Sequence, residues 1–224
     1  MFAINHAATA LIIKKKYQDV PMVWLLVSVQ FMELIWVFFN YFGIERTTTE
    51  NVVSYVGDVH LLYMPFSHSV VTMLGVAVLA WLIISKVFHN PTIGLAVGIG
   101  IASHLILDLV THASDMAIAP AFDGPKLGLG LYASFPIVAF LLEFAYGVAC
   151  WWIYRGSKGL LVVIVVFNLA NLSMFSAAIP GLEGFLANQP MVITTVIFLQ
   201  IVITLVLVGI YSKRKSSAVT AQSL

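Results

Sequence analysis

Six stretches of the chain are apolar over about the 20 residues that a helix needs to cross a bilayer. They lie at 21–43, 67–88, 92–112, 132–154, 159–179 and 190–211. Because the bilayer core offers no water to backbone N–H and C=O groups, we expect these stretches to be helical. Residues 2–13 form a further apolar segment, which as a helix would reach only about 18 Å. The sequence therefore predicts an all-α, polytopic transmembrane helix bundle with six spanning helices plus a short N-terminal half-helix. An interfacial helix is the alternative for residues 2–13.

Composition agrees with this class of protein. Of the 224 residues, 61% are hydrophobic and 9% are charged, which is typical of a membrane protein. The net charge of +1 gives no basic field for nucleic acid, so the expected partners are the lipid bilayer and small molecules, with no nucleic acid. The one cysteine, Cys150, lies in an apolar run and is expected to be a buried free thiol.

Basic residues fall on alternate loops, and this distribution predicts the orientation of the chain. The set comprises Lys14–Lys16, Lys86, Arg155, Lys158 and Lys213–Lys215. We expect these loops and the C-terminus to be cytoplasmic. In a signal peptide the basic residues precede the apolar region, whereas here they follow it, so the first helix is expected to be retained. Residues 1–215 are interpreted as a single integral membrane domain and residues 216–224 as a short polar cytoplasmic tail.

Two long loops, 44–66 and 113–131, face the opposite side of the membrane in this scheme. Loops of this length act as lids or binding segments, or they are plain connectors, and the sequence leaves both readings open. Ser67 follows the first loop and is expected to cap the N-terminus of the next helix.

Several ionisable residues lie inside the apolar stretches. His104, Asp108 and His112 are four residues apart, so they share one face of a helix. A charged residue at the centre of a membrane helix costs about 2.5–3.5 kcal/mol, so a cluster of them indicates a functional site. The others in or beside the spans are His6, Glu33, His68 and Glu143. Counted at helical rise, these side chains fall in one layer between the midplane and the outer boundary of the membrane.

Imidazole and carboxylate ligands without a thiolate suit a divalent metal, with zinc the first choice and manganese and iron as alternatives. A catalytic zinc keeps about three protein ligands and an open position for water, whose pKa then falls toward about 7. A remaining carboxylate would act as general base or would orient a ligand histidine. The structural alternative is that these polar groups only join helices by hydrogen bonds, as a protonated Glu143 would. The roles of His60 and His112 stay open.

Two motifs, Phe66–Ser69 (Phe-Ser-His-Ser) and Ser103–Thr111 (Ser-His-Leu-Ile-Leu-Asp-Leu-Val-Thr), resemble signatures of the YdjM-like inner-membrane proteins. Those proteins are described as membrane-bound metal-dependent hydrolases. An N-terminal helix with one histidine, here His6, fits the same pattern. The resemblance covers roughly residues 1–115. It implies the bacterial inner membrane and, position by position, the metal ligands His6, His68, His104 and Asp108.

The chain departs from the family pattern in two places. Only Glu33 stands where the family has an acidic Pro-Asp-x-Asp motif. Tyr63-Met-Pro65 replaces a His-Arg-Gly that in the family leads into the motif at Phe66–Ser69. That arginine would bind an anionic group of the substrate, and the chain lacks it there.

We weigh three functions. The first is a membrane-embedded metal-dependent hydrolase that acts on a lipid or other amphipathic molecule, with Glu33 as base or ligand. The second is a transporter in which the intramembrane His, Asp and Glu side chains relay protons. The third is a non-catalytic helical protein whose polar residues fix the packing. No serine or cysteine nucleophile motif competes with the first.

Overall fold

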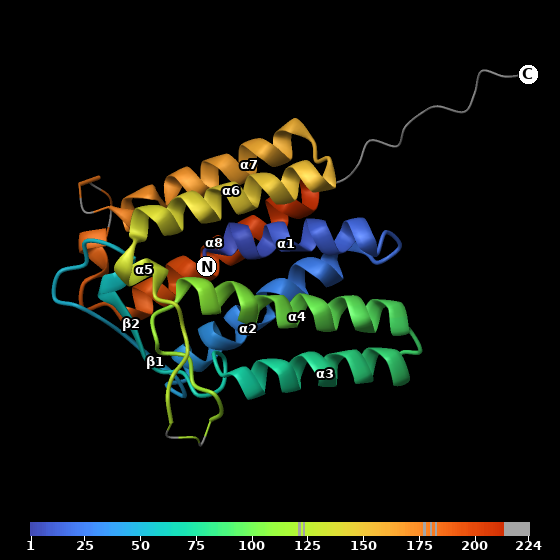
Figure 1. Cartoon of the computed structure of the whole chain (residues 1–224), viewed down its shortest axis with the longest axis horizontal. Helices are drawn as coiled ribbons and strands as arrows, with labels where there is room; N and C mark the ends of the chain where they lie inside the picture. The colour runs from blue at the N-terminus through green and yellow to red at the C-terminus, as the bar shows by residue number, and fades with distance from the viewer. Residues whose placement is uncertain (121, 123, 177, 180, 182, 213–224) are drawn as a thin grey trace, which may run out of the picture.

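The computed structural model describes residues 1–120, 122, 124–176, 178, 179, 181 and 183–212. Its helices run side by side, and the hairpin and the longest loops gather at one end of the bundle (Figure 1). The elements are α1 (Ala3–Lys16), α2 (Met22–Tyr41), β1 (Arg46–Thr49), η1 (Val56–Asp58), β2 (Val59–Tyr63), α3 (Val70–Lys86), α4 (Pro91–Thr111), α5 (Leu131–Ser134), α6 (Pro136–Tyr154), α7 (Lys158–Ala170), η2 (Leu172–Phe175), η3 (Glu183–Leu186) and α8 (Pro190–Tyr211).

Each of the six predicted spans contains a helix, but among the described residues only four helices are long and apolar enough to cross a membrane. These are α2, α4, α6 and α8, and the prediction of six spanning helices is not confirmed. Helix α3 has 17 residues and α7 has 13. Helix α7 ends at Ala170 rather than near residue 179. The side chains of Asn168 and Asn171 there bond to carbonyls four residues back, a local interaction that competes with the regular helix.

The start of α3 also differs from the prediction. Ser69, not Ser67, is its N-cap, and the Ser69 hydroxyl accepts the N–H of Thr72. Ser67 is unavailable as a cap because its hydroxyl donates to Glu45.

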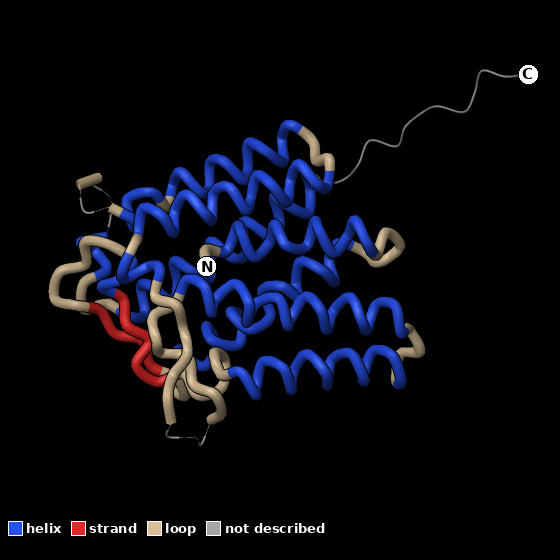
Figure 2. The backbone as a smooth tube through the Cα atoms, in the orientation of Figure 1, coloured by secondary structure: helices blue, strands red, loops and turns tan. Residues whose placement is uncertain are grey.

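A small antiparallel sheet was not predicted. Strands β1 and β2 pair with Arg46 opposite Tyr63 and Thr49 opposite Val59, and they lie across one end of the bundle (Figure 2). The β-branched threonines of β1 favour this extended conformation. The first long loop is therefore an ordered hairpin, not a plain connector.

Helix α1 lies within the bundle, with ten of its 14 residues buried. Its placement favours a half-helix packed against the bundle over an interfacial helix. One glycine permits the close approach of α6 to α1, since a Cβ on Gly147 would lie 2.7 Å from Asn5 Oδ1. A second glycine, Gly100, lets α4 approach Ser28 of α2.

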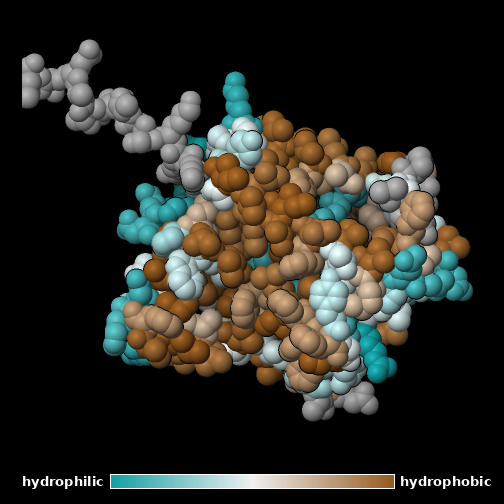
Figure 3. Space-filling model, turned by 180° about the vertical axis from the view of Figure 1, so that it is seen from behind, coloured by the Kyte–Doolittle hydropathy of each residue, from teal (hydrophilic) through white to brown (hydrophobic). Residues whose placement is uncertain are grey.

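The turns that join α1 to α2, α3 to α4 and α6 to α7 all lie at the end of the bundle opposite the hairpin (Figure 1). The predicted basic loops thus share one end. The cytoplasmic location of that end and of the C-terminus stays a prediction. The predicted tail, 216–224, and the basic residues Lys213–Lys215 lie outside the described residues. Seen from behind, the surface over the helices is broadly hydrophobic (Figure 3), as a lipid-facing surface requires.

Candidate metal centre

Three helices and the start of a fourth bring the predicted ligands together. His6 comes from α1, Glu33 from α2, His104 and Asp108 from α4, and His68 from the residues just before α3. His6, His104 and Asp108 are fully buried, and His68 is 1% exposed. The spacing of four in α4 puts His104 Nε2 2.8 Å from Asp108 Oδ2, so the one-face prediction is confirmed for this pair.

The ligand atoms fall into two groups, and within each group all of them lie within 4.8 Å of one another. The first group is His6, Glu33, His104 and Asp108. His6 Nε2 is 3.3 Å from Asp108 Oδ1, and His104 Nε2 is 3.9 Å from Glu33 Oε1. Donor atoms about 2.0–2.1 Å from a tetrahedral zinc lie roughly 3.3 Å from one another, so these separations suit a shared ion.

The second group is His68, Asp108 and His112. His68 Nε2 lies 3.6 Å from Asp108 Oδ2, and His112 Nε2 lies 3.9 Å from Asp108 Oδ1. The predicted ligand set thus divides, because His68 belongs with His112 rather than with His6 and His104. Asp108 is common to both groups. His112, whose role the sequence left open, joins the site as the C-cap residue of α4.

Several of these atoms are buried without a hydrogen-bond partner. Buried atoms that a metal would bind are expected to lack other partners, so these atoms show whether the residues fit a metal. Both ring nitrogens of His6, Nε2 of His104 and Oδ2 of Asp108 have none. His104 Nδ1 lies 3.3 Å from the carbonyl of Val29 and can only donate to it, so in the neutral imidazole Nε2 carries a lone pair. This Nε2 lies 2.8 Å from Asp108 Oδ2, which makes an ion pair when the imidazole is protonated and two facing acceptors when it is neutral. A metal ion bound to both atoms would take the place of that proton, so the donor set fits a metal ion.

Asp108 Oδ1 does have a partner. The amino nitrogen of Met1 lies 2.8 Å from it and 3.1 Å from Thr111 Oγ1. The two oxygens of this carboxylate therefore differ, since only Oδ2 is left unpaired.

Glu45 supports His68 from the loop after α2. Its carboxylate accepts the N–H groups of Phe66 and Ser67 at 2.9 and 2.8 Å and also the Ser67 hydroxyl. With its one hydrogen given to Glu45, Ser67 Oγ accepts from His68 Nδ1 at 2.8 Å. This chain fixes His68 in the tautomer whose Nε2 is free to bind a metal. The sequence reasoning missed Glu45, because it looks like any other acidic residue of an outer loop.

Burial raises the pKa of the Glu45 carboxyl, and the hydrogen bonds from Ser67 and Phe66 oppose that rise.

Glu143 belongs to neither metal group. Its Oε2 accepts the N–H of Phe2 at 3.0 Å and Asn5 Nδ2 at 2.7 Å, and its Oε1 accepts the hydroxyl of Tyr132. Asn5 also donates to Asn168 Oδ1 at 3.0 Å. Glu143 thus holds the start of α1 against α6 and α7, which sets the position of His6 one residue after Asn5.

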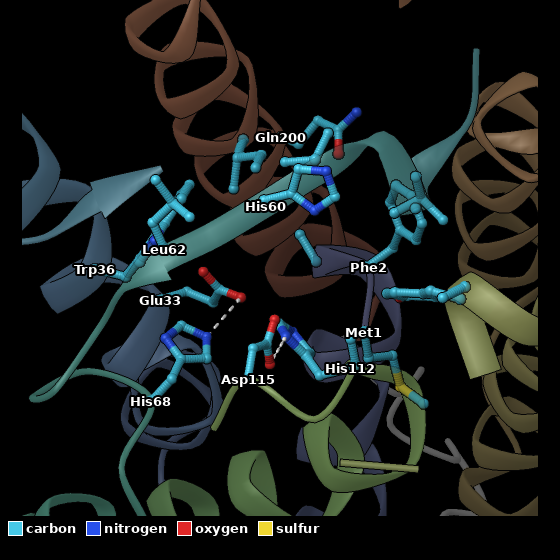
Figure 4. Close-up of a pocket in the computed structure, with 18 of the residues that line it drawn as sticks. Met1, Phe2, Glu33, Trp36, His60, Leu62, His68, His112, Asp115 and Gln200 are labelled. Atoms are coloured by element: carbon cyan, nitrogen blue, oxygen red, sulfur yellow. Dashed lines mark ion pairs between the residues drawn. The ribbon is translucent and has the colours of Figure 1, made fainter. Parts of the chain in front are cut away.

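A cavity of about 370 Å³ opens beside these two groups of ligand atoms, at the hairpin end of the bundle. Glu33, His68 and His112 line it, whereas the fully buried His6, His104 and Asp108 do not. Figure 4 shows His68 paired with Glu33 on one side and His112 paired with Asp115 on the other. The rest of the wall is mainly apolar, with Trp36, Leu62 and Ile197 among its residues. Its size is within the range of small-molecule sites.

The hairpin contributes to the cavity wall. His60 of β2 lines it, and its Nε2 lies 2.8 Å from Glu50 Oε1 in an exposed pair. His60 belongs to neither metal group. The first long loop is thus a wall of the cavity, as expected of a binding segment.

A helical membrane bundle with a buried histidine and carboxylate layer at the floor of a cavity defines the class of this protein. The model of the YdjM inner membrane protein family matches residues 19–180, so the chain belongs to that family and is an integral inner-membrane protein. The match extends well beyond residue 115, where the resemblance seen in the sequence ended, and it begins after His6. Comparison with curated proteins gave no match. Comparison with solved structures gave none either.

Proposed function

We propose that this protein is a membrane-embedded, zinc-dependent hydrolase that acts on a lipid or other amphipathic molecule. The observation that carries the proposal is the group of His6, Glu33, His104 and Asp108, whose ligand atoms lie within 4.8 Å of one another and in which four buried polar atoms have no hydrogen-bond partner. Buried polar atoms without partners cost free energy, which a bound ion would recover.

The proposal gives these residues two roles, metal ligand and general base. Of the four predicted ligands, His6, His104 and Asp108 would hold the metal, and His68 lies on the other side of Asp108. The metal would supply Lewis acidity and lower the pKa of water toward about 7. Glu33 Oε1 lies 3.9 Å from both His68 Nε2 and His104 Nε2 and reaches the cavity, so it would accept the proton of the attacking water.

The cavity supports an amphipathic substrate. Its apolar wall suits an acyl or alkyl chain, and Lys126 on the opposite long loop gives it a cation. Lys126 would take the role of the arginine that this chain lacks before His68. The proposed substrate can therefore carry an anionic headgroup.

The test combines metal content with hydrolysis. Protein purified in detergent would be analysed for bound metal and assayed with 4-nitrophenyl decanoate and decyl 4-nitrophenyl phosphate in mixed micelles. We expect stoichiometric zinc in the wild type and its loss in His104→Ala. In Glu33→Gln we expect metal to be retained and hydrolysis to fall by about 100-fold or more.

Two results would overturn the proposal. One is a wild-type protein that binds no divalent metal, which together with pH-dependent uptake in vesicles would favour a transporter. The other is Glu33→Gln with wild-type turnover of whichever substrate the wild type hydrolyses. His89→Gln, a change at a residue in the turn between α3 and α4, is the matched control and should alter neither readout.

A further inference from the structure

We propose that the buried histidine and carboxylate layer, which comprises both ligand groups, is a two-metal centre. Its second divalent cation would be held by His68, Asp108 and His112. The inference rests on the proposed function in that the layer must bind metal. It adds a second ion, a new ligand in His112, and a role for Asp108 as the residue that the two ions share.

The first argument is geometric. The described residues contain two groups of ligand atoms, each compact enough for one ion, and the groups have only Asp108 in common. A carboxylate offers about four lone-pair sites on its two oxygens, which is enough for two ions. His68 Nε2 lies 3.6 Å from Asp108 Oδ2 and His112 Nε2 lies 3.9 Å from Oδ1, and both residues line the cavity. The buried His104 and His6 approach the same two oxygens, at 2.8 and 3.3 Å.

The second argument comes from what lies behind each imidazole. His68 has its Nδ1 on Ser67, which leaves Nε2 directed toward Asp108 and Glu33. His112 has its Nδ1 3.6 Å from Asp115 Oδ1, which leaves its Nε2 toward Asp108. A histidine with an oxygen acceptor behind it and a free nitrogen in front is the usual arrangement of a metal ligand.

An unpaired atom points to the same conclusion. Asp108 Oδ2 is buried, has no hydrogen-bond partner, and lies between His104 and His68 at 2.8 and 3.6 Å. Asp115 Oδ1, behind His112, is also buried without a hydrogen bond. A neutral His112 with its one ring hydrogen on Nδ1 would direct that hydrogen toward Asp115 Oδ1, 3.6 Å away, and would leave Nε2 to bind an ion.

The two positions differ in access. His6 and His104 are sealed from the cavity, whereas His68 and His112 line it. The ion on His68 and His112 would therefore be the one that a ligand in the cavity meets, and the ion on His6 and His104 would sit behind it. In two-metal hydrolases the pair of ions clamps the attacking and leaving oxygens of one substrate group.

The test is metal stoichiometry. Protein in detergent would be stripped with a chelator, reloaded by dialysis against Zn²⁺, and analysed for metal and protein. We expect two ions per chain in the wild type, one in His112→Gln and one in His68→Gln. The control His60→Gln changes another histidine of the same cavity that belongs to neither group, and it should keep two.

A spectroscopic measurement gives an independent readout. After reloading with Mn²⁺, the wild type should show the multiline electron paramagnetic resonance spectrum of two coupled ions. His112→Gln should show the six-line spectrum of an isolated Mn²⁺. Melting temperature and elution volume of each variant, compared with the wild type, establish that it is folded.

The outcomes separate this inference from the proposed function. One ion per chain in the wild type, lost in His104→Ala and unchanged in His112→Gln, would overturn the two-metal centre and leave the hydrolase standing. Two uncoupled ions would also overturn it. No bound ion at all would overturn both.

Discussion

Two buried polar clusters lie next to each other on α1, and they differ in how their hydrogen bonds are satisfied. Around Asn5, the Glu143 carboxylate accepts three donors and Asn168 pairs with Asn5. Around His6, by contrast, four buried ring and carboxylate atoms have no hydrogen-bond partner. A polar group buried with its partners joins helices, whereas one buried without them costs free energy that a ligand can recover. The comparison distinguishes the Glu143 cluster, whose hydrogen bonds join helices, from the His6 cluster, whose atoms form a candidate ion site.

The largest expected effect is in the His6 cluster. Asp108→Asn removes the anion common to both ligand groups and keeps the side-chain volume. We expect bound zinc to fall from two ions per chain to none, as measured by elemental analysis after reloading. The melting temperature of the metal-free protein should fall as well, because Asp108→Asn removes the carboxylate that pairs with the Met1 amino group at 2.8 Å. Retained metal would contradict the distinction between the clusters.

Glu143→Ala tests the other cluster. It leaves the N–H of Phe2, the amide of Asn5 and the hydroxyl of Tyr132 without their acceptor. Each buried donor left unpaired costs about 1–3 kcal/mol, so the free energy of unfolding should fall by roughly 2–5 kcal/mol. Thermal unfolding of the metal-free protein in detergent measures this loss.

Zinc stoichiometry at saturation is the second readout for Glu143→Ala, and it should stay at the wild-type value. Leu142→Ala, a change at an exposed neighbour in α6, is the control for the loss of side-chain volume. An unchanged melting temperature with lost zinc would reverse the roles assigned to the two clusters.

The sequence predicted much of the site and less of the support around it. The periodicity of four in α4 and the cost of polar groups in a bilayer were enough to select His104 and Asp108. The division of the ligands into two groups depends on helix packing, which no local pattern encodes. Glu45 and Asp115 carried no signal, because acidic residues in outer loops are ordinary. The length of α7 was overestimated because apolar composition continues past Ala170. The length of α3 was overestimated mainly at its start, because Ser69 rather than Ser67 is its N-cap.

The fold also depends on contacts between distant residues, which the sequence pattern does not reveal. Glu143 and Glu33 look alike in the sequence, as isolated ionisable residues in apolar helices, and only their partners in the folded protein distinguish them. Asn5 and Asn168 are 163 residues apart, so their pairing with Glu143 could not be read locally. The hairpin was missed because its strands have four and five residues, too few to give a clear alternation.

Ser67 and Ser69, on either side of His68, differ in the same way as the two clusters: Ser67 contacts a candidate ligand, and Ser69 stabilises a helix. Ser67→Ala breaks the link from Glu45 to His68 Nδ1, so the affinity for zinc should fall by about 10–100-fold. Ser69→Ala removes the N-cap of α3, so it should lower stability by about 1 kcal/mol and leave zinc affinity unchanged. Competition with a chromophoric chelator measures the affinities, and thermal unfolding measures the stabilities. Equal zinc affinities in the two variants would show that the hydroxyl behind His68 has no role in metal binding.

The smallest effect concerns the pH dependence of stability. Burial raises the pKa of Glu45 in the folded protein above its ordinary value of about 4.5, so the folded state binds more protons than the unfolded state between the two values. The stability contributed by this group therefore rises as the pH falls through its folded pKa toward about 4.5, and it is lost as the pH rises again. In metal-free protein, the melting temperature of the wild type minus that of Glu45→Gln should increase as the pH is lowered from 7 to 5. Glu50→Gln, at an exposed carboxylate on the hairpin, is the control. A difference that decreases toward pH 5 would mean that the hydrogen bonds from Ser67 and Phe66 outweigh burial at Glu45.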